Sequence, residues 1–372
     1  MNASMPTLRI KSGRCSALFA YDVGMLIDLD AAEARITEVA QRGGLKHKRR
    51  APIYFEYRPL PLRITRRVPN FAIAGFRSEA TIEVTLFDFG AAQLSYTIPI
   101  SGDLEALHAL SMALYDNVLL LSDSKQQLEQ ILAMVAPAVT RPRISDFVED
   151  YFIYELQLED PQPPLDEVVQ THAHKLAQIL RAEESPLSAQ EVADALSVRM
   201  SFTPSDLALI DWGAAIVFDQ DAEDVRTVLE FANVELLEMR HMDQELDDAL
   251  EQAYTMLSGP ALPWWQRLFH PHSAMEKIAQ LQVDNALLFE SVNNALKLLG
   301  DQYMARVYTN AAKRFHLADW DASILRKLST LESIYEKITE RVASQRMELL
   351  EWIIIVLIAL SIVVTLPGIA GK

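Results

Sequence analysis

Polar and apolar residues alternate in the first hundred residues in a way that predicts β-strands. Thr81–Leu86 and Gln93–Ile98 both follow the two-residue period of a half-buried strand, and Asp88-Phe89-Gly90 lies between them as a turn. This arrangement predicts a β-hairpin. Shorter apolar runs predict strands at 16–21, 25–29 and 53–57, with a helix at 31–40.

From Gly102 the apolar spacing changes to three and four residues. The new spacing continues without a break from Leu104 to Val135, and Pro137 ends it. This heptad pattern predicts one long helix over 102–135. The alternative is a strand at Val118–Leu121.

The second part of the chain repeats features of the first. Tyr151–Tyr154 resembles Tyr54–Tyr57, and Asp211–Ala215 resembles Asp88–Ala92. In both parts the second motif precedes a long helix, which in the second part is predicted from Asp219 to about 257. The shared order predicts two diverged copies of one strand-rich unit.

Two shorter amphipathic helices are predicted between these motifs, over 165–181 and 188–196. Asp166 and Ser188 stand at their N-cap positions, and Glu191 completes a capping box with Ser188.

After residue 258 the pattern is wholly helical, and the last helix is predicted to begin near Asp319. Six apolar residues on this helix keep strict heptad spacing: Ile324, Leu328, Leu331, Tyr335, Ile338 and Val342. Such a seam joins helices in a coiled coil. It therefore predicts either self-association of the chain into a homo-oligomer or packing against helices of the same chain.

The last helix leads into a stretch that carries no charge, from Trp352 to Gly371. As a helix it would span roughly 30 Å, the thickness of the hydrocarbon core of a bilayer. The alternative is a buried core helix. The predicted membrane anchor includes Trp352, Ile353, Ile354, Ile355, Val356, Leu357 and Ile358.

These patterns predict an α+β protein with a single-pass, tail-anchored topology. Its predicted parts are a first α+β unit (1–140), a second α+β unit (144–257), a helical stalk (258–348) and the anchor (349–371). No apolar N-terminal signal precedes a cleavage site, so we expect the bulk of the chain to face the cytoplasm. The membrane would be the inner membrane of a bacterium or of a mitochondrion.

The formal net charge of −17 is unevenly distributed. Residues 1–77 carry 14 Lys and Arg against 6 Asp and Glu, whereas residues 78–257 carry 8 against 34. The basic and acidic parts are expected to attract each other within the fold. Alternatively, a basic surface binds an anionic partner such as RNA, the ribosome or anionic lipid. The candidate residues for that surface are Lys46, Lys48, Arg49, Arg50, Arg63, Arg66 and Arg67.

Candidate chemistry is sparse. Cys15 is the only cysteine, which excludes an internal disulfide framework. The pairs His172/His174 and His270/His272 lack further ligands at metal-site spacing, and Asp219–Asp224 lacks the glycine of a calcium loop. No phosphate loop, nucleophile elbow or zinc-protease motif is present. The sequence therefore predicts no catalytic residue, metal, cofactor or small-molecule substrate.

Two adjacent tryptophans precede the helical stalk. Trp264, Trp265 and Phe269 are residue types that settle at the headgroup boundary of a bilayer. They are predicted either to contact the membrane or to form an aromatic plug between the strand-rich part and the stalk.

Residues 350–358, after a long charged helix that contains Arg346, resemble the C-terminal signature of the "required for meiotic nuclear division" family. Gly213–Phe218 resembles the glycine-led strand motif of that family. The sequence departs from the family pattern at Leu349 and Ser361. The resemblance implies a membrane-anchored, oligomeric protein without an established catalytic activity. Mitochondrial members of that family are associated with organellar translation at the inner membrane.

The leading hypothesis is a membrane-anchored, non-catalytic assembly or tethering protein that self-associates through its stalk. One alternative is a protein that tethers RNA or ribosomes to a membrane. A second is a metal-dependent hydrolase that uses the acidic middle region.

Overall fold

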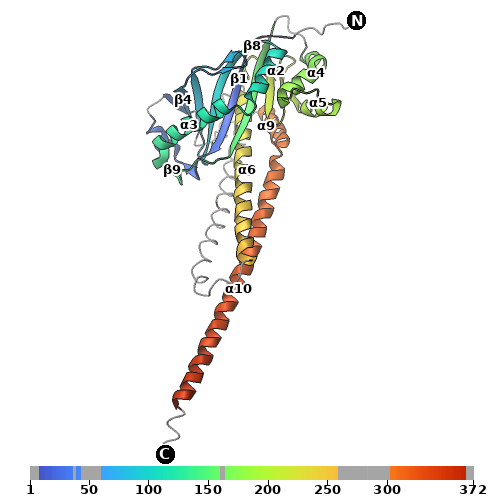
Figure 1. Ribbon diagram of the computed structural model, residues 1–372. Coiled ribbons are helices and arrows are strands. Elements are labelled where there is room, and N and C mark those ends of the chain that lie inside the picture. The colour runs from blue at the N-terminus through green and yellow to red at the C-terminus, as the bar shows by residue number, and fades with distance from the viewer. Residues whose placement is uncertain are drawn as a thin grey trace, which may run out of the picture. The chain divides into compact units, whose positions relative to one another are not determined.

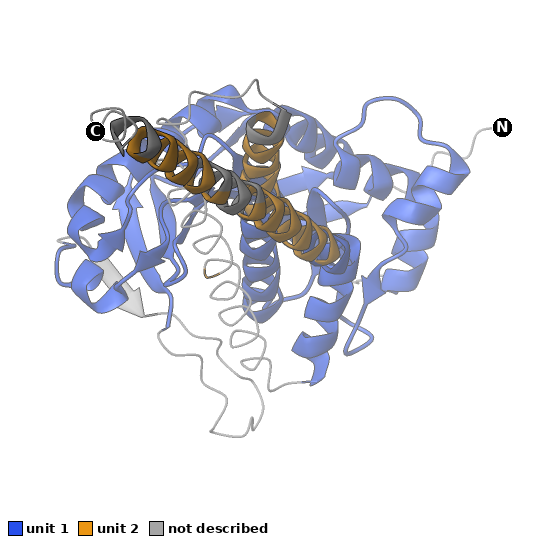
Figure 2. Ribbon diagram, turned by 90° about the horizontal axis from the view of Figure 1, so that it is seen from below, with its two compact units in different colours: residues 1–241, 286–321 blue, residues 242–285, 322–372 orange. Residues whose placement is uncertain are grey.

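The computed structural model describes residues 8–36, 39–42, 60–159, 164–258, 283 and 302–365. Within them the fold is mixed α/β (Figure 1). The chain divides into two compact units, one of residues 1–241 with 286–321 and one of residues 242–285 with 322–372 (Figure 2). The strands of both predicted α+β units lie in the first of these.

A large mixed sheet forms the centre of the first unit. Its strands are β1 (Arg9–Asp22), β3 (Val39–Arg42), β4 (Leu62–Arg67), β7 (Thr81–Leu86), β8 (Ala91–Asp103), β10 (Val148–Leu158), β11 (Arg199–Met200), β12 (Leu207–Ile210) and β13 (Ala214–Phe218). Their order is β11-β12-β13-β10-β1-β8-β7-β4-β3. β10 and β13 are parallel, whereas the other neighbouring pairs are antiparallel. Two short pairs are β2 (Leu26–Ile27) with β9 (Val139–Thr140), and β5 (Ala72–Ile73) with β6 (Phe76–Arg77).

The helices are α1 (Leu29–Glu33), α2 (Leu104–Leu114), α3 (Val118–Val135), the 3₁₀ turn η1 (Ala136–Ala138), α4 (Leu165–Arg181), α5 (Ala189–Ala195), α6 (Glu223–Ser258), α9 (Gln302–Arg314) and α10 (Leu317–Thr365). The structure confirms the predicted hairpin as β7–β8, and it confirms α4, α5 and the long helix α6. Ser188 caps α5, with its hydroxyl accepting from Glu191 N. The predicted Asp166 cap is wrong, because Pro164 stands at the N-cap of α4.

The prediction of one helix over 102–135 is also wrong, and so is the alternative of a strand at Val118–Leu121. The segment forms α2 and α3, which meet at 57°. Asp116 adopts a left-handed backbone conformation (φ 48°), and the Asn117 side chain then accepts from Leu120 N to start α3. The restart changes the buried face, so Val118 is 74% exposed and Leu120 is buried.

The two predicted copies differ in how their strands pair. In the first half β1 pairs with β8, the second strand of its hairpin, in an antiparallel arrangement. In the second half β10 pairs with β13, again the second strand of a hairpin, in a parallel arrangement. The predicted duplication does not explain this reversal.

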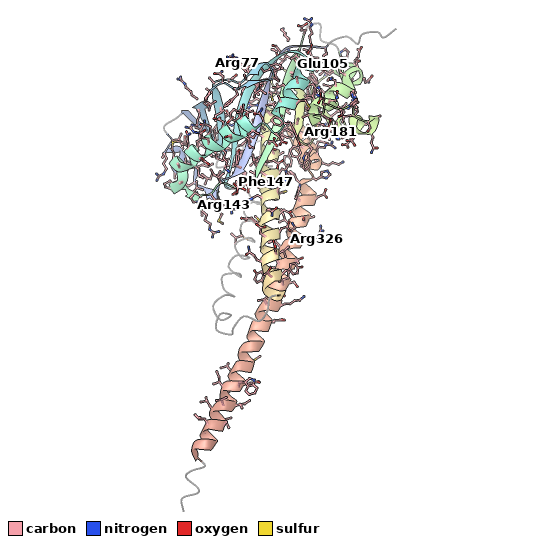
Figure 3. All side chains as sticks on the ribbon, in the orientation of Figure 1. Arg77, Glu105, Arg143, Phe147, Arg181 and Arg326 are labelled. Carbon is pink, nitrogen blue, oxygen red and sulfur yellow. The ribbon has the colours of Figure 1, made fainter. Side chains whose placement is uncertain are left out.

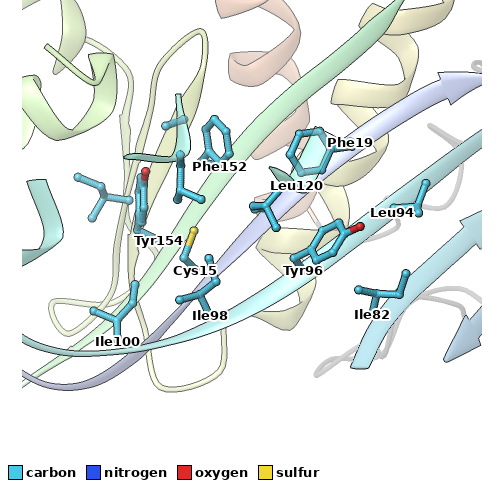
Figure 4. Close-up of a cluster of buried hydrophobic side chains, with 14 of the residues drawn as sticks. Cys15, Phe19, Ile82, Leu94, Tyr96, Ile98, Ile100, Leu120, Phe152 and Tyr154 are labelled. Atoms are coloured by element: carbon cyan, nitrogen blue, oxygen red, sulfur yellow. The ribbon is translucent and has the colours of Figure 1, made fainter. Parts of the chain in front are cut away.

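One face of the sheet carries the main hydrophobic core under α2, α3 and α4. Because side chains alternate across a strand, Cys15, Phe19 and Tyr21 of β1 point to this face together. Neighbouring strands contribute Leu94 and Tyr96, and the Phe19 and Tyr96 rings pack edge to face 5.9 Å apart (Figure 4).

The opposite face of the sheet packs against α6. Ala20, Phe87, Phe89 and Ala91 form a small apolar cluster with Val234 and Leu237 of this helix. Beside it, basic and acidic side chains alternate in a row of ion pairs across four strands and α6. The pairs are Arg14–Glu155 (2.7 Å), Glu155–Arg226 (3.3 Å), Arg226–Glu230 (3.2 Å), Glu230–Arg63 (3.4 Å) and Arg63–Glu83 (2.6 Å). The predicted attraction between the basic and acidic parts of the chain is therefore confirmed at Arg14 and Arg63.

A buried carboxyl group joins α6 to α9. The Tyr308 hydroxyl donates to Glu235 Oε2 at 2.6 Å, and both side chains are buried. Burial raises the pKa of Glu235 to about 7, although the hydrogen bond from Tyr308 lowers it. The folded state therefore holds this proton more tightly than the unfolded chain does.

We expect Glu235→Gln to flatten the pH dependence of stability. The favourable contribution of Glu235 is fully present below the ordinary carboxyl pKa of 4.5 and is lost as pH rises through about 7. The unfolding free energy of Glu235→Gln, measured relative to that of the wild type, should therefore be higher at pH 8 than at pH 4.5 by on the order of 3 kcal/mol. Denaturant unfolding of the full chain at both pH values measures this change. Glu251→Gln, at an exposed position of α6, is the matched control and should leave the unfolding free energy unchanged at both pH values. Parallel pH profiles for wild type and Glu235→Gln would contradict the assignment.

In the second unit, α10 lies along the C-terminal part of α6. Lys327 forms ion pairs with Asp243 (2.9 Å) and Asp247 (2.6 Å), and Ser323 donates to Asp243. Four predicted seam residues are buried within this single chain: Ile324, Leu328, Leu331 and Tyr335. Ile338 is half-buried, and the side chain of Val342 lies outside the described residues. Burial of these four positions does not require a second chain, so self-association through the seam stays a prediction.

Among the described residues, no single helix has both the length and the hydropathy of a membrane span. The apolar stretch Leu350–Ser361 of α10 is shorter than a membrane span requires. The bent pair of 104–114 and 118–138 meets the criterion when both helices are taken together. Several apolar residues of that pair, including Leu107, Leu110 and Leu128, belong to the hydrophobic core.

Candidate functional site

A cavity of about 610 Å³ opens in the first unit where the N-terminal ends of β10 and β13 meet the ends of α4 and α9. β10 begins at Val148 but pairs with β13 only from Phe152, so its first residues extend past that neighbour. The cavity is lined by four carboxylates, three guanidinium groups and several aromatic rings. The charged residues are Glu149, Asp150, Asp194, Asp211, Arg181, Arg240 and Arg314.

Asp211 is the buried centre of a network of ion pairs. Its carboxylate accepts from Arg181 Nε at 3.1 Å, from Arg314 Nε at 2.8 Å and from the Trp212 backbone N–H at 2.8 Å. Asp194 on α5 accepts from the same two arginines, from Arg181 at 2.6 Å and Arg314 at 2.7 Å. Hydrogen bonds from Arg314, and then from Arg181, lower the pKa of Asp194 to about 2. Arg181, at the end of α4 (Figure 3), also pairs with Glu191.

Aromatic packing holds the end of α9 at the same place. The Tyr151 ring meets that of Phe315 at 5.3 Å, and its hydroxyl donates to the Asp211 carbonyl at 3.0 Å. Trp212 packs edge to face on Phe315 at 6.4 Å and lies beside His316. Trp212 remains 40% exposed, so part of its indole faces the cavity that it lines.

A second ion pair lies at the start of β10. Arg240 donates to Glu149 at 2.5 Å, and the guanidinium stacks 4.6 Å from the centre of the Phe147 ring. Burial raises the pKa of Glu149 to about 7, although Arg240 lowers it. The cavity therefore combines paired charges, one titrating carboxyl group and an aromatic wall.

The chain matches a protein family described as "Uncharacterized protein MJ0711, N-terminal domain" over residues 12–224. It belongs to this family. The match runs from β1 into the first turn of α6, and thus includes the sheet residues that line the cavity together with α4 and α5. Arg240 and Arg314 lie beyond the matched residues.

One relative is an uncharacterized protein, MJ0711, of Methanocaldococcus jannaschii. It is 25% identical over 228 residues, which cover 60% of this chain and 67% of the relative. No solved structure matches the chain.

The predicted anionic-partner surface is only partly described. Lys46, Lys48, Arg49 and Arg50 lie outside the described residues. Arg66 donates to the Gln127 carbonyl at 3.2 Å and to the Gln130 side chain at 3.0 Å. Arg67 is exposed. The hypothesis of RNA or ribosome tethering stays a prediction.

No group of three or more His, Cys, Asp or Glu side chains is placed to hold a metal ion among the residues that the structure describes. His172 stands at a kink in α4 (φ −110°, ψ 17°), and burial lowers its pKa. His270 and His272 lie outside the described residues, as do Trp264, Trp265 and Phe269. The metal-dependent hydrolase hypothesis therefore stays a prediction as well.

Asp211 and Trp212 resemble Asp88 and Phe89 in the sequence, but nothing in the sequence indicates that they line a cavity. Arg181 and Arg314 reach Asp211 from 30 and 103 residues away in the chain. Neither arginine stands in a motif. The one local signal was the polar residue Asp211 between two apolar strands.

Proposed function

We propose that this chain is a membrane-anchored tethering protein whose anchor is the C-terminal end of α10. The observation that supports the proposal is the exposure of consecutive apolar side chains. From Trp352 to Ile358 each residue is between 45% and 67% exposed, and Leu360 is 59% exposed. These residues cover about two helical turns, so every side of the helix is apolar and uncovered.

A helix that is apolar on all sides requires an apolar environment, which is either a protein core or a bilayer. Residues 352–371 carry no charge, and a continuous helix of this many residues would match the hydrocarbon thickness. The resemblance of residues 350–358 to the "required for meiotic nuclear division" signature supports the same role. Such an anchor would keep the cavity-bearing first unit attached to the bilayer, as a tethering role requires.

We expect the full chain to resist extraction from membranes by alkaline carbonate. The double substitution Ile354→Lys with Ile358→Lys places two charges in the apolar stretch, and each opposes insertion by about 3 kcal/mol. This variant should move to the supernatant. The matched control is Leu325→Lys with Ser329→Lys, which introduces the same charges at exposed positions of α10, again four residues apart. The control should stay in the pellet. Release of the wild type by carbonate, or equal behaviour of the two variants, would contradict the proposal.

A further inference from the structure

Four carboxyl groups and three guanidinium groups line the cavity. Asp194 and Asp211 pair with Arg181 and Arg314, and Glu149 pairs with Arg240. One carboxylate remains, that of Asp150. Among the described residues no Arg, Lys or His side chain lies within ion-pair distance of it, and it is partly buried. Arg240 acts on Asp150 from beyond ion-pair distance but pairs with Glu149, so Asp150 has no ion-pair partner of its own among the described residues.

Aromatic residues line the same cavity as Asp150. Phe152 and Tyr154 follow it at two-residue steps on β10 and therefore lie on the same face of the sheet. Tyr115, at the corner between α2 and α3, and Trp212 also line the cavity, and both remain partly exposed. Phe152 and Tyr154 are buried, so the exposed rings in the cavity are those of Tyr115 and Trp212. A carboxylate and exposed aromatic rings in one cavity are the combination that binds organic cations, through an ion pair and a cation–π contact.

We propose that this cavity binds the guanidinium or ammonium group of an organic cation, with Asp150 as its counter-ion and the aromatic residues as its wall. The group comes either from a small alkylguanidine or alkylamine, or from an Arg or Lys side chain of a peptide. The volume of about 610 Å³ is within the range of small-molecule sites. This inference is independent of the membrane anchor, because every residue that it uses belongs to the first unit.

The protonation of Asp150 gives the proposal a second signature. Burial raises the pKa of Asp150, and the nearby Asp116 carboxylate contributes to the rise. A bound cation stabilises the ionised carboxylate, so binding releases protons wherever the free carboxyl is partly protonated. Affinity should therefore fall as pH is lowered through the raised pKa. Arg240 lowers the pKa of Asp150, and Glu149 and Tyr21 also interact electrostatically with this carboxylate.

The test is calorimetric titration of the full chain, in an uncharged detergent, with n-butylguanidinium. We expect saturable binding at one site with a Kd on the order of 1 mM, and binding at least about tenfold weaker in Asp150→Asn. Asp146→Asn is the matched control. It is the same substitution four residues earlier, at a fully exposed carboxylate outside the cavity, and it should bind like the wild type. Neither n-butanol nor acetate should bind.

Equal affinity in Asp150→Asn and wild type would overturn the proposal, as would saturable binding of acetate or no saturable heat at about ten times the expected Kd. If Asp150→Asn does not fold, the wild type decides the question. Its affinity must fall with decreasing pH, and its binding heat must depend on the ionisation enthalpy of the buffer. A pH-independent affinity would reject the proposal. A blocked Gly-Arg-Gly peptide that binds at least about tenfold more tightly than butylguanidinium identifies a peptide as the source, and weaker binding identifies a small cation.

Discussion

Asp211→Asn should lower the free energy of unfolding of the first unit by about 3 kcal/mol, because it removes the central charge of a buried network. Asp211 is 1% exposed and pairs with both Arg181 and Arg314. Asparagine keeps the shape of the side chain but leaves two guanidinium groups without their buried counter-ion. The melting temperature of the full chain should fall by roughly 10 °C, as measured by circular dichroism.

Asp194→Asn is the control for this prediction, because it removes a carboxylate that binds the same two arginines. The Asp194 side chain is 53% exposed, so water screens and replaces its contacts. The loss should be below about 1 kcal/mol. Equal losses in the two variants would show that burial of Asp211 does not determine the strength of the network.

A double-mutant cycle tests whether the coupling runs through Arg314. Arg314→Met alone leaves Asp211 with Arg181 as its ion-pair partner. Combined with Asp211→Asn, it should cost less than the sum of the two single substitutions, since the Arg314–Asp211 contact is lost in both single variants but only once in the double variant. Additive losses would mean that the 2.8 Å contact contributes little.

Local patterns predicted the elements whose cause is local. The β7–β8 hairpin follows from alternation on both sides of a turn, and α5 begins where Ser188 can cap it. The break between α2 and α3 was missed because Val118 and Leu121 keep heptad spacing across it. The turn depends on two polar residues, the left-handed Asp116 and the cap Asn117, which the apolar period does not include.

The cavity could not be predicted for a different reason. Its charges come from β10, the turn between β12 and β13, α4, α5, α6 and α9, which the fold brings together. The composition did predict that basic and acidic parts attract each other, and Arg63 with Glu230 is one case at 3.4 Å. Net charge does not specify partners, however, so neither the Asp211 network nor the unpaired Asp150 could be deduced from it.

Leu331→Asp should unfold the second unit locally without changing the number of chains in the particle. Leu331 is completely buried within one chain, and aspartate there removes a packed side chain and places a charge in the core. The expected loss is on the order of 4 kcal/mol. Hydrogen exchange of the full chain in uncharged detergent should then speed up by roughly 100-fold or more at 242–258 and 322–340, because opening of the α6–α10 pair becomes easier.

Leu325→Asp separates this effect from a general effect of charge on α10. Leu325 is 52% exposed on the same helix, so its substitution should leave exchange unchanged. If the heptad seam instead joins chains, Leu331→Asp should lower the particle mass measured by light scattering. Hydrogen exchange of α6 should then remain as slow as in the wild type. The burial of Ile324, Leu328 and Tyr335 within the chain, and the ion pairs of Lys327 with Asp243 and Asp247, favour the first outcome. Both helices of the seam then come from one molecule, and any partner chain must contact another surface.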